Sequence, residues 1–189
     1  MSEFSNAAAG SQEETDAYVA SLLALLGDRD PLEVQQELPE AVAQAIAGLD
    51  EAAVRRPEKP GKWSIAQVVQ HLADSELVTG YRVRSVAAQA GTALQGYDQD
   101  LWARELGYET VSLQDSLAQL RALRAANLRL LRRLSPAQLE RTGLHSERGA
   151  ESVGRMLRLT AAHDLLHRRQ IERIKQAVAG APGSEGKRW

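Results

Sequence analysis

The feature that most constrains this chain is a helical spacing of apolar residues that returns in four long stretches. Apolar side chains recur at intervals of three and four residues, as in Leu113, Leu117 and Leu120, which places them on one face of an α-helix. No strand-like alternation, Asn-Gly hairpin signal or internal repeat competes with this pattern. The sequence therefore predicts an all-α chain, and four long helices with one long connection predict a four-helix bundle.

Capping and breaking residues give the expected helix boundaries. Ser64 and Gln67 have the spacing of a capping box, so a helix should begin at Ser64. Ser112 opens a later helix in the same way, while glycine and proline interrupt the first stretch near residues 27–31. The helical stretches are expected at residues 13–49, 64–89, 112–134 and 152–178. We expect a long connection at 91–110 and a loop at 141–151.

Length and composition predict one domain without a membrane span. The chain has 189 residues, of which 43% are hydrophobic and 25% charged, as in ordinary globular proteins. We expect a folded domain at residues 12–178 between flexible ends at 1–11 and 179–189. The sequence has no membrane-spanning apolar run and no signal peptide, which predicts a cytoplasmic protein without a membrane partner. Because there is no cysteine, any metal must be held by His, Asp or Glu.

Charge is unevenly distributed along the chain. The net charge is −2, which gives no general attraction to nucleic acid. Residues 1–60 nevertheless carry 12 acidic and 4 basic side chains, whereas residues 61–189 carry 13 acidic and 19 basic ones. This asymmetry favours an acidic N-terminal helix packed beside basic later helices. A cationic pocket for an anionic substrate is the alternative interpretation.

Three of the four histidines fall at positions that face the predicted core. His163 and His167 are four residues apart in the apolar stripe of the last helix, so their imidazoles share one face and can reach one divalent ion. His71 lies on the flank of the apolar stripe of the second helix and completes a three-histidine site if the two helices are neighbours. The alternative is hydrogen-bonded core histidines. His145, in the segment GLHSERG, is expected to be a surface or loop-anchoring residue rather than a fourth ligand.

Other polar residues interrupt the apolar stripes. Asp164 lies within His-Asp-Leu-Leu-His, which is similar to the His-Glu-x-x-His of zinc proteases, but its side chain is one methylene too short for the general base. We therefore expect Asp164 to orient a histidine or to pair with an arginine. Glu76, Arg124 and Asn127 predict a buried ion-pair network between helices, or the lining of a pocket beside the metal.

The segments GKWSIAQVVQHLADSE, GYDQDLWARELGY and AAHDLLHRRQIERI resemble the DinB/YfiT-like superfamily over residues 30–176. This resemblance implies a bundle of up-down-down-up topology with one divalent ion, Zn, Ni or Fe, on His71, His163 and His167. It also implies a homodimer, and it implies neither DNA polymerase activity nor DNA binding. We expect Tyr97, Trp102 and Tyr108 to pack the long connection over one end of the bundle near the metal.

The resemblance implies two enzymatic functions on a small-molecule substrate. Three imidazoles leave open positions on the ion, where a water or an exogenous thiol can bind and lose its proton. The protein is thus expected to be a metal-dependent transferase, moving a low-molecular-weight thiol such as bacillithiol, mycothiol or glutathione to an electrophile, or a hydrolase. The alternatives are a non-catalytic metal-binding or stress-response bundle and a purely structural bundle that associates through exposed apolar surface.

Overall fold

The computed structural model describes residues 12–179. The flexible ends predicted at 1–11 and 179–189 lie outside these described residues, except for Ala179, which is the last residue of the final helix. Helices and strands follow one another in the order α1 (Gln12–Leu26), α2 (Pro31–Ile46), α3 (Glu51–Arg55), α4 (Ile65–Ala88), β1 (Ala93–Leu94), α5 (Gln99–Glu105), α6 (Leu113–Leu131), α7 (Pro136–Leu139), β2 (Thr142–His145), β3 (Gly149–Ser152) and α8 (Val153–Ala179). Among the described helices, none is both long and apolar enough to cross a bilayer.

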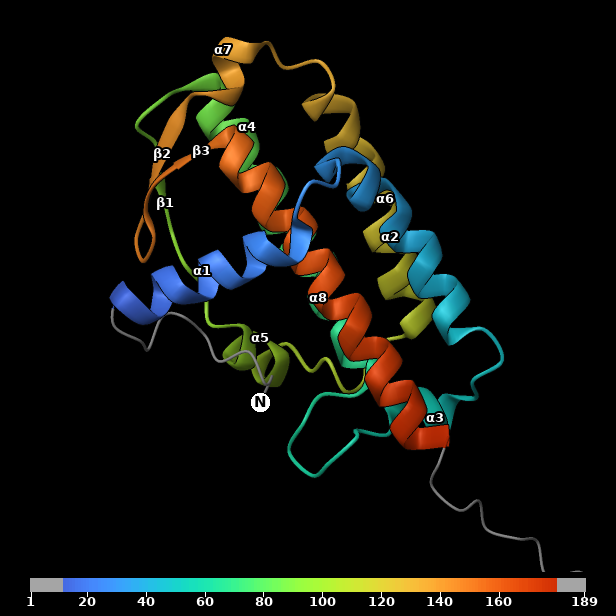
Figure 1. Cartoon of the computed structure of the whole chain (residues 1–189). Helices are drawn as coiled ribbons and strands as arrows, with labels where there is room; N and C mark the ends of the chain where they lie inside the picture. The colour runs from blue at the N-terminus through green and yellow to red at the C-terminus, as the bar shows by residue number, and fades with distance from the viewer. Residues whose placement is uncertain (1–11, 180–189) are drawn as a thin grey trace, which may run out of the picture.

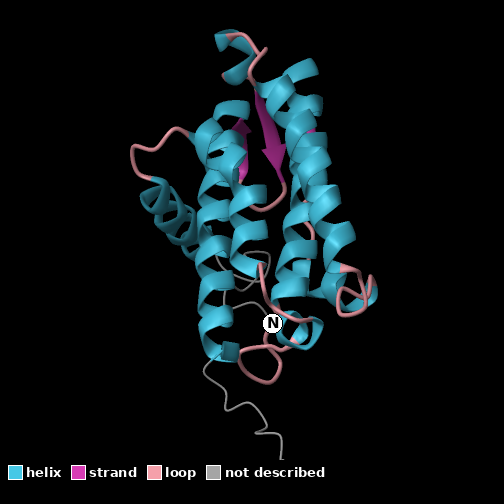
Figure 2. Cartoon of the chain, turned by 90° about the vertical axis from the view of Figure 1, so that its right-hand side faces the viewer, coloured by secondary structure: helices cyan, strands magenta, loops and turns pink. Residues whose placement is uncertain are grey.

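The long helices α2, α4, α6 and α8 form the predicted four-helix bundle. Helix α4 packs on α6 and α8, and α2 packs on the same two helices. Figure 1 shows that α2 and α8 run in one direction and α4 and α6 in the other, which is the up-down-down-up order. Figure 2 shows the long helices side by side, with the strands at one end. The predicted helical fold and its four-helix bundle are confirmed, apart from the small sheet described below.

Local sequence signals explain where these helices begin. The Ser64 hydroxyl accepts a hydrogen bond from the Gln67 amide, and the Gln67 side chain accepts one from the Ser64 amide, so the predicted capping box opens α4. Asp30 caps α2, where Pro31 occupies the first helical position. The bundle helices therefore start where their backbone donors find partners.

The first apolar stretch forms two helices, of which only α2 belongs to the bundle. Gly27 ends α1 with a φ of 58°, a conformation that residues with a Cβ rarely adopt. Helix α1 then packs across α8, as Figure 1 shows, through Leu22 and Leu26 against Ala161 and Ala162. The predicted interruption near residues 27–31 thus directs α1 away from the bundle and over one of its faces.

A small sheet at one end of the bundle corrects two predictions. Strand β1 pairs in parallel with β2, and β2 pairs antiparallel with β3, although the sequence predicted no strand and a loop at residues 141–151. Each strand has only two to four residues, which is too short to show a convincing alternation. Gly143 lets the sheet approach α4 closely, because a Cβ there would lie 2.6 Å from Val86 Cγ2.

The long connection carries β1 and α5 along the bundle. It leaves the end of α4 beside the sheet and returns to the opposite end, where α6 begins (Figure 1). Parallel neighbours such as α4 and α6 require a connection of this kind, because a short turn joins only antiparallel helices. The segment at 91–110 is therefore a long connection, as predicted, with a short helix inside it.

Candidate metal centre

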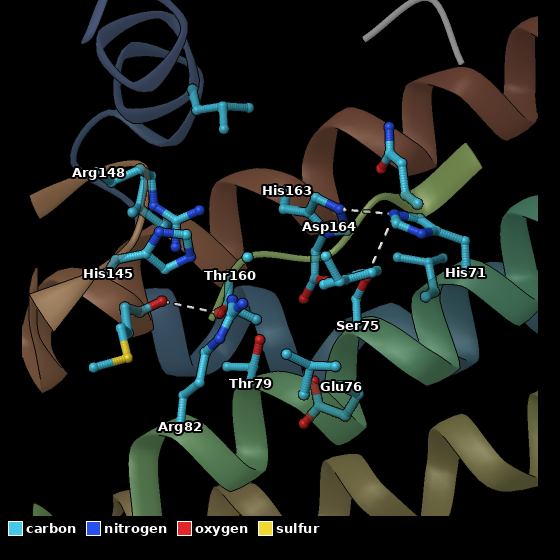
Figure 3. Close-up of a pocket in the computed structure, with 18 of the residues that line it drawn as sticks. His71, Ser75, Glu76, Thr79, Arg82, His145, Arg148, Thr160, His163 and Asp164 are labelled. Atoms are coloured by element: carbon cyan, nitrogen blue, oxygen red, sulfur yellow. Dashed lines mark hydrogen bonds between the residues drawn. The ribbon is translucent and has the colours of Figure 1, made fainter. Parts of the chain in front are cut away.

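Three histidine side chains from two helices converge on one point. The Nε2 atom of His163 lies 3.1 Å from Nε2 of His71 and 3.0 Å from Nε2 of His167. Each residue offers one ring nitrogen, and these three nitrogen atoms all lie within 4.8 Å of one another. Figure 3 shows His71 on α4 facing His163 on α8. The structure thus brings together the three residues that the sequence singled out.

Helix geometry explains this convergence. His163 and His167 occupy adjacent turns of the same face of α8. The packing of α4 on α8 places His71 opposite them, with ring centroids 5.2 Å from His163 and 4.8 Å from His167. His71 and His167 are almost fully buried, while His163 is partly exposed. The cluster is therefore a core feature that opens to one side.

The protonation of the cluster follows from its surroundings. The Nδ1 atom of His167 lies 2.7 Å from Oε1 of Gln170. Because an amide oxygen only accepts, Nδ1 carries the hydrogen and the lone pair of the neutral ring is on Nε2. Burial lowers the pKa of His167 to about 4, and it lowers the pKa of His71 and His163 well below the usual value, with His167 contributing. All three imidazoles are therefore neutral at pH 7, as metal ligands must be.

Two of the three nitrogen–nitrogen separations are close to those expected around a divalent ion. Zinc–nitrogen distances of about 2.0–2.1 Å at tetrahedral angles place ligand nitrogens about 3.3 Å apart. The 3.0 and 3.1 Å separations around His163 are close to that value. As a hydrogen-bonded arrangement the cluster is poor, since one hydrogen on His163 Nε2 cannot point fully at both neighbours. Imidazole nitrogen is a ligand that Zn, Ni and Fe all accept.

Hydroxyl groups lie beside the cluster. Ser75 Oγ lies 3.4 Å from Nε2 of His71 and 2.8 Å from the hydroxyl of Tyr97. The Tyr97 ring packs on Trp102 with centroids 4.5 Å apart. The long connection therefore covers the cluster with Tyr97, as predicted. Sequence reasoning missed Ser75, although its position one turn after His71 on α4 was a usable signal.

The remaining aromatic residues near this end serve packing. Trp63 lies against His71 with ring centroids 5.0 Å apart, and His71 Nδ1 has no hydrogen-bond partner among the described residues. Packing therefore orients His71, whereas a hydrogen bond to Gln170 orients His167. Tyr108 is buried and donates to Asp74 at 2.6 Å. It anchors the connection in the core and does not line the cavity described below.

A charged network lies directly behind the cluster. Arg124 Nη2 lies 3.1 Å from Asp164 Oδ1 and 2.9 Å from Glu76 Oε2, the latter as an ion-pair contact rather than an aligned hydrogen bond. The Asn127 amide donates to Glu76 Oε1 at 2.7 Å. These contacts confirm the predicted buried network and the pairing of Asp164 with an arginine. Glu76 and Arg124 also line the cavity described below, so the network and the alternative of a pocket lining both hold for these two residues. Burial opposes the charge on Arg124, but Asp164 and Glu76 outweigh it and raise its pKa.

A cavity of about 180 Å³ leads away from the cluster. His71 and His163 line one end of it, together with Ser75 and Tyr97. Arg82, His145 and Arg148 line the other end, and side chains of α1 cover it. The volume is well above the roughly 10–15 Å³ that one water requires. The cavity therefore gives a small molecule access to two of the three histidines.

His145 corrects a prediction. It is only 4% exposed, because the alternation along β2 exposes Thr142 and Leu144 and turns Gly143 and His145 inward. The surface role is therefore wrong, while the anchoring role holds, since its Nδ1 accepts a hydrogen bond from the Glu147 amide at 3.2 Å. His145 does not join the three-histidine group.

The fold and the site define a helical bundle with a candidate metal centre between two of its helices. The family model of the DinB superfamily matches residues 36–171. The chain therefore belongs to the DinB superfamily, as its motifs indicated.

Proteins of similar sequence are named as metal-dependent hydrolases. A Bacillus mycoides protein named "Putative metal-dependent hydrolase" is 29% identical over 161 residues, which cover 85% of this chain and 92% of that protein. An Oceanobacillus iheyensis protein with the same type of name is 30% identical over 70% of this chain and 76% of the relative. These names, together with the three-histidine group, support a divalent metal.

A solved structure shares the fold. YfiT from Bacillus subtilis, described as "a probable metal-dependent hydrolase with an unusual four-helix bundle topology", aligns with a TM-score of 0.69 and 26% identity. The alignment covers 76% of this chain and 84% of YfiT.

Proposed function

We propose that this protein is a metal-dependent enzyme whose divalent ion is held by His71, His163 and His167. One observation carries the proposal: three neutral imidazoles from α4 and α8 converge within 4.8 Å at the end of a cavity. A bound divalent ion supplies Lewis acidity there, which activates a water or a thiol as a nucleophile. Three protein ligands leave a position open on such an ion, which is typical of catalytic rather than structural sites.

The surrounding residues have separate tasks in this proposal. Gln170 holds His167 in the tautomer that presents Nε2, and Trp63 fixes the ring of His71 by packing. Ser75 and Tyr97 place two linked hydroxyls beside His71, where they can position the substrate or pass a proton. Asp164 is engaged by Arg124 behind the cluster, which removes it from the role of general base in a protease-like motif.

Two reactions suit this site. Hydrolysis of a small-molecule substrate agrees with the names of the relatives. Transfer of a low-molecular-weight thiol to an electrophile would use the same Lewis acidity, and because the chain has no cysteine the thiol must be a second small molecule. Two alternatives remain. The cavity beside the histidines disfavours a purely structural bundle, whereas only a test of turnover separates the enzyme from a non-catalytic metal-binding protein.

Elemental analysis followed by activity screens tests the proposal. Protein purified without an affinity tag or added metal should contain one divalent ion per chain. The loaded protein should then hydrolyse test substrates, or conjugate bacillithiol, mycothiol or glutathione to an electrophile, whereas the His167→Ala variant should not. Absence of bound metal would contradict the proposal. Bound metal without turnover would favour the non-catalytic alternative.

We also propose that the protein works as a cytoplasmic homodimer without a nucleic-acid partner. Leu77 and Tyr81, one turn apart on α4, are 49% and 70% exposed and give the bundle an apolar contact surface. Light scattering should report twice the monomer mass at micromolar concentration. A monomer under those conditions would contradict the dimer.

A further inference from the structure

The end of the cavity away from the histidine cluster gathers basic side chains from two separate parts of the chain. Arg82 projects from α4, while His145 ends β2 and Arg148 lies in the turn before β3. Figure 3 shows His145 beside Arg148, with Arg82 reaching toward Thr160, apart from His71 and His163. The proposed metal chemistry uses none of these three side chains.

His145 presents a buried hydrogen-bond donor that no described residue accepts. Its Nδ1 accepts from the Glu147 amide, so the neutral ring carries its hydrogen on Nε2. Burial, with Arg148 and Arg82 nearby, lowers the pKa of His145 to about 4, which keeps the ring neutral. Nε2 is buried and has no hydrogen-bond partner among the described residues. Such a donor calls for an acceptor in the cavity.

The local charge is positive after the internal pairs are counted. Arg148 is engaged by Glu151 through contacts of 2.6 and 2.8 Å. Arg82 donates to the Gln95 carbonyl but forms no ion pair with a described carboxylate. Arg155 lies outside the cavity lining but also acts on Glu151, while Glu147 and Glu151 both act on Arg82, so three guanidinium groups and two carboxylates share this region. Within the cavity lining of this end, Arg148 has an ion-pair partner in Glu151, whereas Arg82 has none among the described carboxylates.

We propose that Arg82, His145 and Arg148 form a subsite for the acidic group of the substrate, a carboxylate or a phosphate. A guanidinium and a neutral N–H donor are the groups that bind such oxygens. Val19, Leu22 and Met156 give the cavity apolar walls. This inference rests on the proposed function and specifies its substrate class: a small amphipathic acid, bound by its acidic group at this end, whose other end reaches the histidine cluster.

Binding of simple aromatic acids tests the subsite without requiring turnover. The probes are benzoate and phenylphosphonate, with benzamide as the uncharged analogue, at constant ionic strength. We expect saturable binding of at least one acid, seen as shifts of the His145 imidazole signals in NMR spectra and as a raised melting temperature, and no response to benzamide. The stronger of the two acids identifies the headgroup as carboxylate or phosphate.

Matched variants separate this subsite from the metal centre. Arg82→Gln should weaken binding of the acid at least tenfold, whereas Arg104→Gln, an exposed arginine of α5 paired with Glu105, should not. His145→Gln should also weaken it. Chelator-treated wild-type protein and His167→Ala should still bind the acid.

Two results would overturn the subsite. One is the absence of saturable binding to the wild-type protein. The other is binding that survives Arg82→Gln but is lost on chelation, which would place the acid on the metal ion. Failure of the proposed function looks different, since a protein without metal or turnover would still bind the acid through Arg82.

Discussion

Two polar clusters lie side by side in the core of this bundle, and they differ in charge and in what their side chains contact. The first contains Arg124, Glu76, Asp164 and Asn127, which are charged or strongly polar and make their contacts with one another. The second is the histidine cluster, whose members are neutral and direct nitrogen atoms at a single point.

The difference teaches which buried polar residues hold the fold and which remain available for chemistry. In the first cluster each charge has a partner of opposite sign, so removing one member exposes the others to an apolar interior. In the second cluster no member neutralises another, and an ion can satisfy all three. We therefore expect stability to depend on the first cluster and metal binding on the second.

Substitution of Arg124 should have the largest effect. Arg124→Met leaves Glu76 and Asp164 buried without a cation, so the free energy of unfolding should fall by about 3–5 kcal/mol in urea denaturation at pH 7. The matched control is Arg121→Met, because Arg121 makes an exposed pair with Glu40. This substitution should change the free energy of unfolding by less than about 1 kcal/mol. Equal stability of the two variants would remove the distinction between the clusters.

Gly80→Ala should have the next largest effect. A Cβ at Gly80 would lie 2.5 Å from both amide atoms of Asn127, so Asn127 must move away from Glu76. Overpacking of this kind lowers the free energy of unfolding by about 1–3 kcal/mol. Gly154→Ala on α8 is the control, since its nearest described neighbour is at 3.5 Å. Metal content should not change in either variant; loss of metal in Gly80→Ala would show that the two clusters are coupled.

Removal of a histidine should change metal content more than stability. His71→Ala or His167→Ala should lower bound metal at least tenfold, while circular dichroism still reports a folded helical chain. The chain stays folded because apolar residues of the bundle supply the core without the ion. His145→Ala is the control and should keep its metal. Stoichiometric metal in both His71→Ala and His167→Ala would show that the proposed ligands are wrong.

The smallest expected effect concerns pH and His145. Its pKa is about 4 in the folded chain, where burial and the cations of Arg148 and Arg82 disfavour protonation and Glu151 favours it. The usual value is about 6.5 when unfolded, so between these values the unfolded chain binds more protons and stability falls as pH falls. From pH 7 to pH 6, His145 should lower the free energy of unfolding by about 0.7 kcal/mol.

Urea denaturation of chelated protein at both pH values measures the effect. His145→Gln should lose less stability than the wild type over this step, because its side chain does not titrate. An identical loss in the two proteins would mean that His145 titrates normally.

Much of the fold was predictable because the signals are local and repeated. Helices α2, α4, α6 and α8 are long enough for the apolar spacing to recur several times, and Ser64 marks the start of α4 by its own chemistry. The strands were missed because two to four residues carry no usable period. Their positions depend on the pairing of β1 with β2, segments far apart in the sequence.

In the site, too, the residues set by one helix were predictable, and those set by contacts between distant segments were not. His163 and His167 were predictable because one helix sets their spacing, and Ser75 follows His71 by one turn of α4. The inward position of His145 was not predictable, since it depends on the hairpin and on its packing against α4. Neither was the meeting of Arg82 with Arg148, which requires the long connection and the sheet to be in place.

The residues that line the cavity come from two kinds of segment, and this has an evolutionary consequence. The histidines lie on two long bundle helices, whereas Tyr97, His145 and Arg148 lie on the connection and the hairpin. Segments outside the bundle tolerate substitution and changes of length far better than packed helices do. Descendants of such a chain can therefore acquire new substrates by altering the connection and the hairpin while the ion-binding histidines stay unchanged. One bundle can in this way give rise to many specificities.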